Sequence, residues 1–241
     1  MIKISVCCVT YNRPKFLGEL IQSFLMQTYP ASHRELIILD DAGQYGNLQG
    51  DGWQIVSFPR RIASLGEKRN TSVSLTSPDF THIAIADDDD ILLPWWLETH
   101  VKHLEQGARW TVGNTAYWSE NQQITGKWHY REGDIWMLHP GQVFEKEIFW
   151  KVHGYPYVSG WEDRDLFYRW IDEGFKAQNV LNDESKPYLI YRRFTETCHM
   201  SCVPLESYQK DFQPVLPKAE LQIGWTRDYL FDIDQYEKSH S

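Results

Sequence analysis

Four consecutive aspartates at residues 87–90 directly follow the apolar run "IAIA" at 83–86. Side chains two residues apart in extended backbone share a face, so Asp87 and Asp89 are placed to bind one hard cation. A divalent ion would remove the repulsion between these carboxylates and could bridge to phosphate oxygens, as Mg2+ and Mn2+ do. The stretch lacks the glycine-containing pattern of an EF-hand loop, which argues against a structural calcium site. A solvated acidic turn is the alternative that the four residues alone leave open.

Two further groups of acids could take part in chemistry. Asp40 and Asp41 end the apolar stretch "ELIILDD", and Glu162, Asp163 and Asp165 begin the helical pattern "EDRDLFYRW". The helix dipole stabilises negative charge there, whereas mutual repulsion favours protonation, and the sequence does not say which effect is larger. A carboxylate with its pKa tuned toward neutrality could deprotonate a hydroxyl group. An acidic first turn of a surface helix is the other interpretation.

The composition argues against several classes of protein, although a locally basic groove stays possible. With 42% apolar and 24% charged residues, the 241-residue chain is typical of a folded globular protein. Its net charge of -9 does not favour binding to a nucleic-acid backbone, which depends on clustered lysine and arginine. No apolar stretch approaches the roughly 20 residues of a membrane helix, and the first strand pattern runs straight into "YNRP", unlike a signal peptide. We therefore expect no membrane segment and a cytoplasmic location.

Cysteine and tryptophan carry weaker signals. Cys7 and Cys8 are adjacent in a strand pattern, so they point to opposite faces and favour a reducing compartment. The stretch "CHMSC" at 198–202 offers three zinc ligands but no nearby fourth. The 11 tryptophans are compatible with a buried core or with a site where aromatic faces pack on sugar rings.

The first half of the chain alternates strand and helix patterns. Unbroken apolar runs predict strands covered on both faces at 2–11, 35–41, 53–58 and 81–86. Helical patterns lie at 14–28, 66–76 and 94–107, with Asn12 as the expected N-cap of the first and a glycine-rich loop at 42–52. This alternation predicts an α/β fold with a mostly parallel sheet flanked by helices.

Three polar clusters fall at one edge of this predicted sheet. "TYNR" follows the first strand, "LDDAG" the second and "ADDDD" the fourth. Ligands collect at the carboxyl ends of parallel strands, so this edge is the expected site. Later in the chain we expect antiparallel strands, two helices, a last strand and a less readable tail, at 109–120, 122–133, 145–154, 161–174, 187–193 and from 204. We expect a single domain, residues 1–241, with two halves that meet at about residue 106.

Five motifs, taken in order, resemble those of the family 2 glycosyltransferases, which have the GT-A fold. They are "VTYNRPKFL", "ELIILDDAG", "GEKRNTSV", "IAIADDDDILLPWWLE" and "WEDRDLFYRW". Each motif alone is weak, but five in order over about residues 2–200 are specific. The resemblance implies a GT-A, Rossmann-like sheet with a smaller antiparallel portion on the acceptor side. Residues 1–106 would bind the nucleotide-sugar, and residues 107–241 would bind the acceptor and form the C-terminal tail.

The same resemblance implies which residues bind the donor. Its nucleobase and ribose would contact Thr10, Tyr11, Asn12, Arg13, Asp40 and Asp41. Arg69 and Asn70 match an Arg-Asn pair beside the nucleotide. Asp87 and Asp89 match the DxD element, whose Mn2+ or Mg2+ ion grips the diphosphate. Asp88, counted here with the nucleotide-sugar site, stands where a small residue is usual, and His199 resembles a late histidine that contacts the metal or the diphosphate.

Catalytic and acceptor residues follow from the resemblance as well. Glu162 and Asp163 match the family's ED element. In inverting members the second acid is the general base, so Asp163 is the expected base here. Trp161, next to the acids, and His139, in "LHPGQVF", are expected on the acceptor side. A structural role is the alternative for His139.

We therefore predict a metal-dependent, inverting glycosyltransferase that moves a sugar from a nucleotide diphosphate, with a UDP-sugar as the expected donor, to an acceptor hydroxyl. The acceptor could be a glycan, a lipid-linked sugar, a protein or a modified nucleobase. One alternative is a nucleotidyltransferase of similar architecture, against which the lack of a glycine-rich, basic stretch after the first strand argues. Another is a catalytically silent sugar- or nucleotide-binding module, against which the intact Asp87, Asp89 and Asp163 argue.

Overall fold

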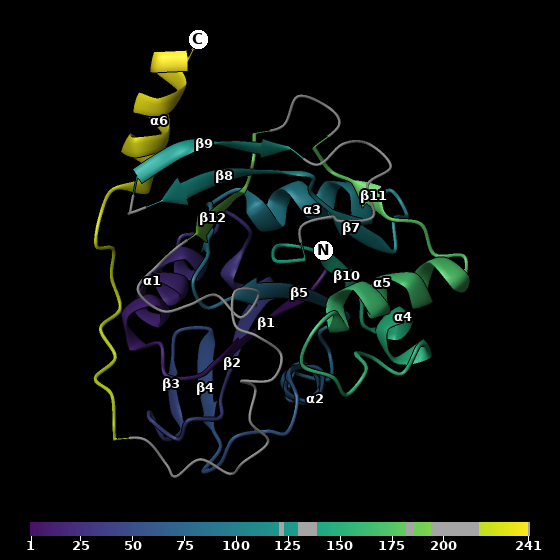
Figure 1. Cartoon of the computed structure of the whole chain (residues 1–241). Coiled ribbons are helices and arrows are strands. Elements are labelled where there is room, and N and C mark those ends of the chain that lie inside the picture. The colour runs from purple at the N-terminus through teal and green to yellow at the C-terminus, as the bar shows by residue number, and fades with distance from the viewer. Residues whose placement is uncertain (121–122, 130–138, 182–185, 194–216, 241) are drawn as a thin grey trace.

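The computed structural model describes residues 1–120, 123–129, 139–181, 186–193 and 217–240 (Figure 1). Within these ranges the main sheet has eight strands. In spatial order they are β11 (Gln178–Asn179), β7 (Trp110–Val112), β10 (Val143–Glu145), β5 (His82–Asp87), β1 (Ile4–Thr10), β2 (Arg34–Asp40), β4 (Trp53–Ser57) and β3 (Leu48–Gly50). The predicted α/β fold is confirmed.

The centre of this sheet is parallel, and its strands end at one edge. β1 pairs in parallel with β2 and β5, and β2 pairs in parallel with β4. Thr10 lies opposite Asp40, and Val9 lies opposite Asp87. The polar residues that follow these strands therefore meet at a common edge, as the sequence predicted.

Helices cover both faces of the sheet, which explains the unbroken apolar strands. On one face, Ile4, Val6 and Cys8 of β1 belong to the same core as residues of α1 (Pro14–Leu25) and α3 (Trp96–Leu104). On the other face, Cys7 belongs to a second core with residues of α2 (Leu65–Ser74), α4 (Lys146–Lys151) and α5 (Glu162–Asp172). A short 3-10 turn, η1 (Ala31–His33), precedes β2.

The first helix begins at Pro14, as predicted, but its N-cap residue differs from the prediction. Arg13 occupies the N-cap position, and Pro14 follows at the first helical position. Asn12 instead has a left-handed backbone with φ of 55°, so the prediction that it caps α1 is wrong. Asparagine tolerates this conformation better than most residues, and the turn sends the chain from the sheet edge into α1.

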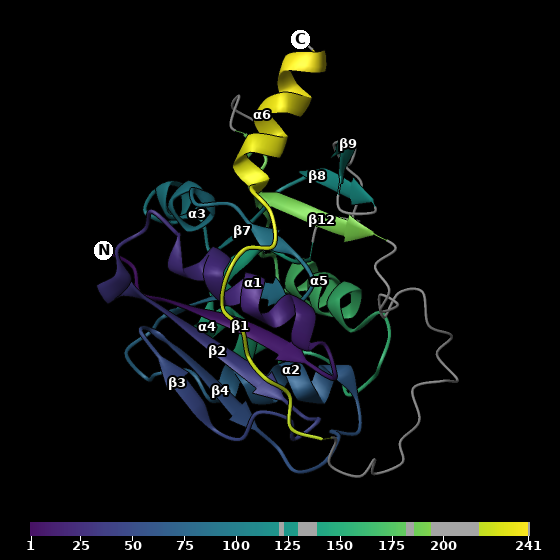
Figure 2. The ribbon, with the colours of Figure 1, turned by 90° about the vertical axis from the view of Figure 1, so that its left-hand side faces the viewer.

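A second, mixed sheet lies beside α3 (Figure 1 and Figure 2). Its order is β6 (Ile91–Leu92), β12 (Leu189–Arg193), β8 (Thr115–Glu120) and β9 (Gln123–His129). The strand expected at 109–120 is divided between the two sheets, since β7 joins the main sheet and β8 the second. The break falls at Gly113, where a Cβ atom would lie 2.5 Å from the hydroxyl oxygen of Tyr188.

Several described elements had no counterpart in the sequence prediction, namely η1, β3, β6, β10, β11 and α6 (Tyr229–His240). β3 forms a hairpin with β4 inside the expected glycine-rich loop, and the connecting pair Asp51-Gly52 is a known hairpin signal. Helix α6 lies in the tail, where the Asp228 side chain accepts from the Phe231 N–H at 3.1 Å. Its buried Tyr229 and Ile233 are four residues apart and pack on the second sheet.

The residues before α6 form an extended segment that crosses α1, which we call the C-terminal strap (residues 217–226; Figure 2). Its Gly224 N–H donates to the Gly18 carbonyl at 3.4 Å, and a Cβ atom on Gly18 would lie 1.7 Å from the Gln222 carbonyl oxygen. At the other end, the Ala219 N–H donates to the Gln44 carbonyl at 3.2 Å. The strap therefore joins α1 to the loop that follows β2.

In the described part of the chain, none of the helices combines the length and apolar character needed to cross a bilayer.

Candidate functional site

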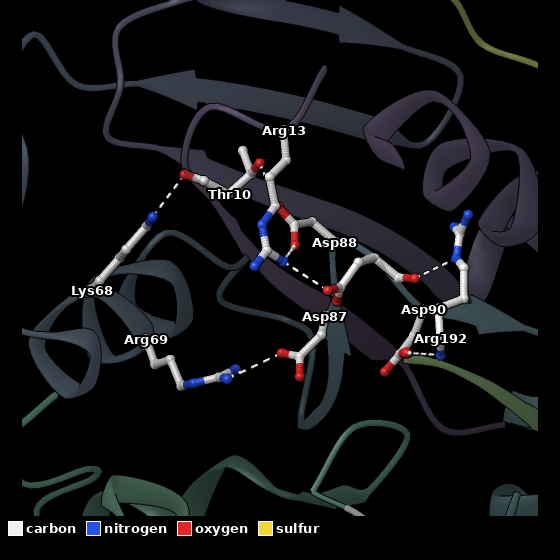
Figure 3. A network of polar contacts seen from close by, with 9 residues as sticks. Thr10, Arg13, Lys68, Arg69, Asp87, Asp88, Asp90 and Arg192 are labelled. Carbon is white, nitrogen blue, oxygen red and sulfur yellow. Dashed lines mark hydrogen bonds and ion pairs between the residues drawn. The ribbon is translucent and has the colours of Figure 1, made fainter. Parts of the chain in front are cut away.

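The four aspartates form a tight turn at the end of β5, not the extended segment that the side-chain alternation assumed. Asp87 is the last residue of β5, and the Asp90 N–H donates to the Asp87 carbonyl at 3.3 Å. Asp88, Asp89 and Asp90 are 4%, 1% and 0% exposed. Buried carboxylates need partners, and the neighbouring elements supply them (Figure 3).

Arg13 binds two of these carboxylates at once. Its Nη1 atom lies 2.9 Å from Asp88 Oδ1 and 2.8 Å from Asp89 Oδ2. Thr10, at the end of β1, donates its hydroxyl to Asp88 Oδ2 at 2.7 Å. Burial alone would lower the pKa of Arg13, but Asp88 and Asp89 hold it above its ordinary value. Asp88 thus ties the turn to β1 and to the start of α1.

The turn at residues 87–90 is called the aspartate turn below, and α5, which begins with Glu162 and Asp163, is called the ED helix. Arg69 connects the two. Arg69 Nη2 donates to Asp87 Oδ1 at 3.0 Å, and Arg69 Nε donates to Glu162 Oε1 at 3.3 Å. Glu162 is the first residue of α5 and is 4% exposed. Burial, with the nearby charges of Asp163 and Asp87, raises the pKa of Glu162 to about 7 despite Arg69. Desolvation and like charges therefore outweigh the guanidinium at this carboxyl.

Asp163 and Trp161, also at the start of α5, are more exposed than Glu162. Asp163 is half-buried, and its Oδ1 atom accepts from the Arg164 N–H at 2.8 Å. Trp161 has a left-handed backbone with φ of 64° and is 51% exposed. The Arg164 guanidinium lies 4.4 Å from the centre of its ring. An uncommon backbone conformation of this kind often accompanies a functional side chain.

His139 and Asn70 both contact Tyr155, in the loop that precedes α5. The Nε2 atom of His139 lies 3.0 Å from the Tyr155 hydroxyl oxygen. Burial and Arg69 lower the pKa of His139 to about 4, so its ring is neutral at pH 7. The Asn70 amide donates to the Tyr155 carbonyl and accepts from the Tyr155 N–H, both at 2.8 Å. In this structure Asn70 therefore holds the loop that carries Trp161.

Asp40 and Asp41 bind groups of their own chain. Asp40 accepts from the N–H groups of Ala42 and Gln44, each at 2.8 Å, and from the Ser57 hydroxyl at 2.6 Å. Asp41 accepts from the Ile62 N–H at 2.9 Å and from the Lys68 ammonium. These contacts shape the loops at the sheet edge. Donor contacts of the two aspartates stay a prediction.

Lys68 is a site residue that the sequence reasoning missed, although it precedes Arg69 in the "KRN" motif. Its ammonium bonds to Asp41 and also donates to the Thr10 carbonyl at 2.7 Å. Tyr11 lies beneath Arg61, whose guanidinium is 4.4 Å from the ring centre. Asn12 accepts from the Gln44 side chain at 3.3 Å. The "TYNR" residues are thus gathered at the same edge as the aspartate turn.

The predicted metal site is only partly visible. His199, Cys198 and Cys202 lie outside the described residues. Across the ranges that the structure describes, no cluster of three or more His, Cys, Asp or Glu side chains is arranged to hold a metal ion. Asp87 and Asp89 offer the hard oxygen ligands that Mn2+ and Mg2+ prefer. Their donor set therefore fits such an ion, although each carboxylate also binds an arginine.

Curated relatives of this chain are named as glycosyltransferases. "Putative glycosyltransferase EpsE" of Bacillus subtilis is 27% identical over 201 residues, which cover 74% of this chain and 70% of EpsE. An uncharacterized glycosyltransferase of Haemophilus influenzae is 27% identical over 159 residues, which cover 61% of this chain and 48% of that protein. The chain thus spans most of one relative and about half of the other.

Solved structures share the fold. S. aureus TarS 1-349 in complex with UDP-GlcNAc superposes with a TM-score of 0.65 at 17% identity, covering 84% of this chain and 62% of that one. The mannosyltransferase PcManGT of Pyrobaculum calidifontis, in complex with GDP-Man and Mn2+, gives a TM-score of 0.55 at 15% identity, covering 86% and 58%. At these identities the likeness concerns the fold, and it confirms the predicted GT-A class. The sequence model of glycosyl transferase family 2 matches residues 5–170, which include all five motifs of the resemblance, and the chain belongs to that family.

Proposed function

We propose that the protein transfers a sugar from a nucleotide diphosphate to an acceptor hydroxyl, with metal dependence and inversion at the anomeric carbon. The observation that carries this proposal is the Arg69 bridge. Its guanidinium holds Asp87 of the DxD element and Glu162 of the ED element, at 3.0 Å and 3.3 Å. A donor held at Asp87 would therefore lie next to the acids at the start of α5.

Asp87 and Asp89 are the proposed ligands of a Mn2+ or Mg2+ ion. When bound, such an ion would act as a Lewis acid on the leaving diphosphate. The proposed nucleotide contacts come from Thr10, Tyr11, Asn12 and Arg13, together with Asp40, Asp41, Arg69, Asn70 and Asp88. His199 is kept as a proposed third ligand.

The nucleobase is proposed to be uracil. TarS, whose fold this chain shares, has been solved with UDP-GlcNAc and with UDP. The neighbour solved with GDP-Man makes a guanine donor the competing candidate. Both should therefore be offered to the protein.

Asp163 is the proposed general base. It is half-buried and can meet an acceptor, whereas Glu162 is 4% exposed and held by Arg69. In a single displacement the acceptor oxygen forms its bond to the anomeric carbon as the bond to the diphosphate oxygen breaks. The hydroxyl proton passes to Asp163, and the electron pair leaves with the diphosphate. One displacement inverts the configuration. Glu162 then serves to keep Arg69 and the helix start in place.

The acceptor is proposed to bind beside Trp161 and His139, in the second half of the chain. Trp161 presents half of its side chain at the edge of the ED helix, and an aromatic ring of this kind can pack on the apolar face of a sugar. The division of one domain, residues 1–241, into a donor half and an acceptor half at about residue 106 belongs to the same proposal.

A panel of UDP-, GDP- and dTDP-sugars tests the proposal. We expect metal-dependent hydrolysis of one donor, with release of the nucleoside diphosphate and none in EDTA. A nucleotidyltransferase would instead release or consume pyrophosphate, and a silent binding module would bind a nucleotide without turnover. Failure of every donor to bind with Mn2+ present would reject the assignment.

A further inference from the structure

A buried ion pair between Glu19 and Arg192 lies next to the aspartate turn. Glu19, in the middle of α1, is 2% exposed, and Arg192 of β12 is 6% exposed. Arg192 Nη1 donates to Glu19 Oε2 at 2.5 Å. Two buried charges are costly unless further hydrogen bonds satisfy them, so their remaining contacts indicate what the pair is for.

Arg192 holds the backbone of the turn. Its Nε atom donates to the Asp89 carbonyl, and its own backbone N–H donates to Asp90 Oδ1 at 3.2 Å (Figure 3). Asp89 is therefore held from two sides, its carboxylate by Arg13 and its carbonyl by Arg192. A backbone carbonyl fixed in this way limits the rotation of the peptide groups on which the Asp89 side chain depends.

Glu19 in turn is held by the C-terminal region. Its Oε1 atom accepts from the Thr226 N–H at 3.0 Å, from the Thr226 hydroxyl and from the Tyr229 hydroxyl at 2.9 Å. Thr226 is the last residue of the C-terminal strap, and Tyr229 is the first residue of α6. A continuous path of hydrogen bonds therefore runs from the C-terminal region through Glu19 and Arg192 to the Asp89 carbonyl.

We propose that Glu19 and Arg192 are positioning residues for the aspartate turn, and that Thr226 and Tyr229 anchor them. The C-terminal region then keeps Asp89 in the orientation that donor binding needs, although it lies more than 130 residues away in sequence. This inference rests on the proposed function, because it takes the aspartate turn as the donor site. It assigns to the strap and α6 a part in donor binding that their place at the end of the chain does not suggest.

Hydrogen exchange of the 241-residue chain tests the coupling without any ligand. Thr226→Val with Tyr229→Phe removes two hydroxyl donors to Glu19 and keeps the shape of both side chains. We expect amide exchange in residues 87–93 to quicken at least about fivefold, because the turn opens locally when its support loosens. Asp234→Asn is the matched control, since it breaks the exposed Lys238–Asp234 pair of α6 without touching Glu19. Thr226→Ser, which keeps the hydroxyl, should behave as the wild type.

Titration with Mn2+ and UDP, and with Mn2+ and GDP, gives the second measurement. The double variant should bind the preferred nucleotide about fivefold to tenfold more weakly, while Asp234→Asn and Thr226→Ser bind as the wild type does. Faster exchange confined to α6 and the strap, with residues 87–93 unchanged, would overturn the inference. A wild-type protein that binds neither nucleotide would instead reject the proposed donor site, and the exchange result would still decide the coupling.

Discussion

The Arg69 guanidinium lies 3.3 Å from the Glu162 carboxylate and joins α2 to the first residue of α5. The same guanidinium binds Asp87 at 3.0 Å. Two acids that lie far apart in sequence are therefore fixed relative to each other by one rigid, planar group. Arg69 would therefore fix the position of a donor bound at Asp87 relative to a base at the start of α5.

Asp163→Asn should separate donor binding from transfer. The amide cannot take a proton from the acceptor hydroxyl, so turnover should fall at least about a hundredfold. Binding of the nucleotide with Mn2+ should stay within about twofold, because the aspartate turn is unchanged. Initial rates and calorimetry measure the two effects. Asp165→Asn, in the same helical turn, is the control and should keep both, whereas turnover in Asp163→Asn near that of the wild type would remove Asp163 from the role of base.

Asp89→Ala should abolish metal-dependent binding of the nucleotide. The substitution removes a proposed ligand and leaves Arg13 with one of its two carboxylates. Loss of a ligand should weaken metal binding by at least the roughly tenfold to hundredfold found for outer contacts of metal sites. Calorimetry of the wild type with UDP, in Mn2+ and then in EDTA, gives the reference.

The control for Asp89→Ala is Asp79→Ala. The Asp79 side chain is 59% exposed and pairs with Lys3, just before the start of β1, whereas the site lies at the other end of that strand. The affinity of Asp79→Ala should match that of the wild type. Unchanged binding by Asp89→Ala, or equal binding by the wild type in Mn2+ and in EDTA, would count against a metal held at this turn.

Glu162 should make the protein less stable as the pH rises from about 4.5 to about 7. Its pKa is raised from 4.5 to about 7 by burial, so between these values the unfolded chain releases a proton that the folded chain keeps. Stability falls with rising pH wherever the folded state binds more protons. The loss in the free energy of unfolding reaches about 3 kcal/mol at pH values above 7, and there is no loss at pH values well below 4.5.

Glu162→Gln removes this titration, so the variant is the reference with which the wild type is compared. Urea denaturation at pH 4.5 and 7.5 gives the change in the free energy of unfolding for each protein. The wild type should lose about 3 kcal/mol more than Glu162→Gln over this interval. Parallel pH profiles for the two proteins would show that Glu162 is ionised in the fold.

The sheet and its functional edge could be predicted because their signals are local. Unbroken apolar runs identify β1, β2 and β5. Because the strands are parallel, their carboxyl ends lie at the same edge of the sheet. The turn at residues 87–90 could not be read in the same way. Side-chain alternation assumes extended backbone, whereas the turn brings Asp88 and Asp89 to one guanidinium.

The partners of the acids depend on how helices pack, which the sequence pattern does not encode. Glu19 appears in a helical pattern as an ordinary polar residue, and only the fold sets it against Arg192, 173 residues later. Helix α6 was missed because prolines and polar residues in the tail obscure the spacing of Tyr229, Ile233 and Tyr236. Long-range ion pairs and short terminal helices are therefore the parts of such a site that a structure adds.

Gly66→Ala should loosen the contact between α2 and the loop before the ED helix. Gly66 donates its N–H to the Val158 carbonyl at 3.0 Å, and a Cβ atom would lie 1.8 Å from the Pro156 carbonyl oxygen. Backbone must move to admit the methyl group, so we expect a loss of about 1–3 kcal/mol in the free energy of unfolding. Gly126→Ala is the control, because a Cβ atom there meets nothing within 4 Å. Since the loop leads directly to Trp161 and the ED acids, turnover in Gly66→Ala should also fall while nucleotide binding with Mn2+ is kept. Equal stability of the two variants would show that the loop is not packed on α2 in solution.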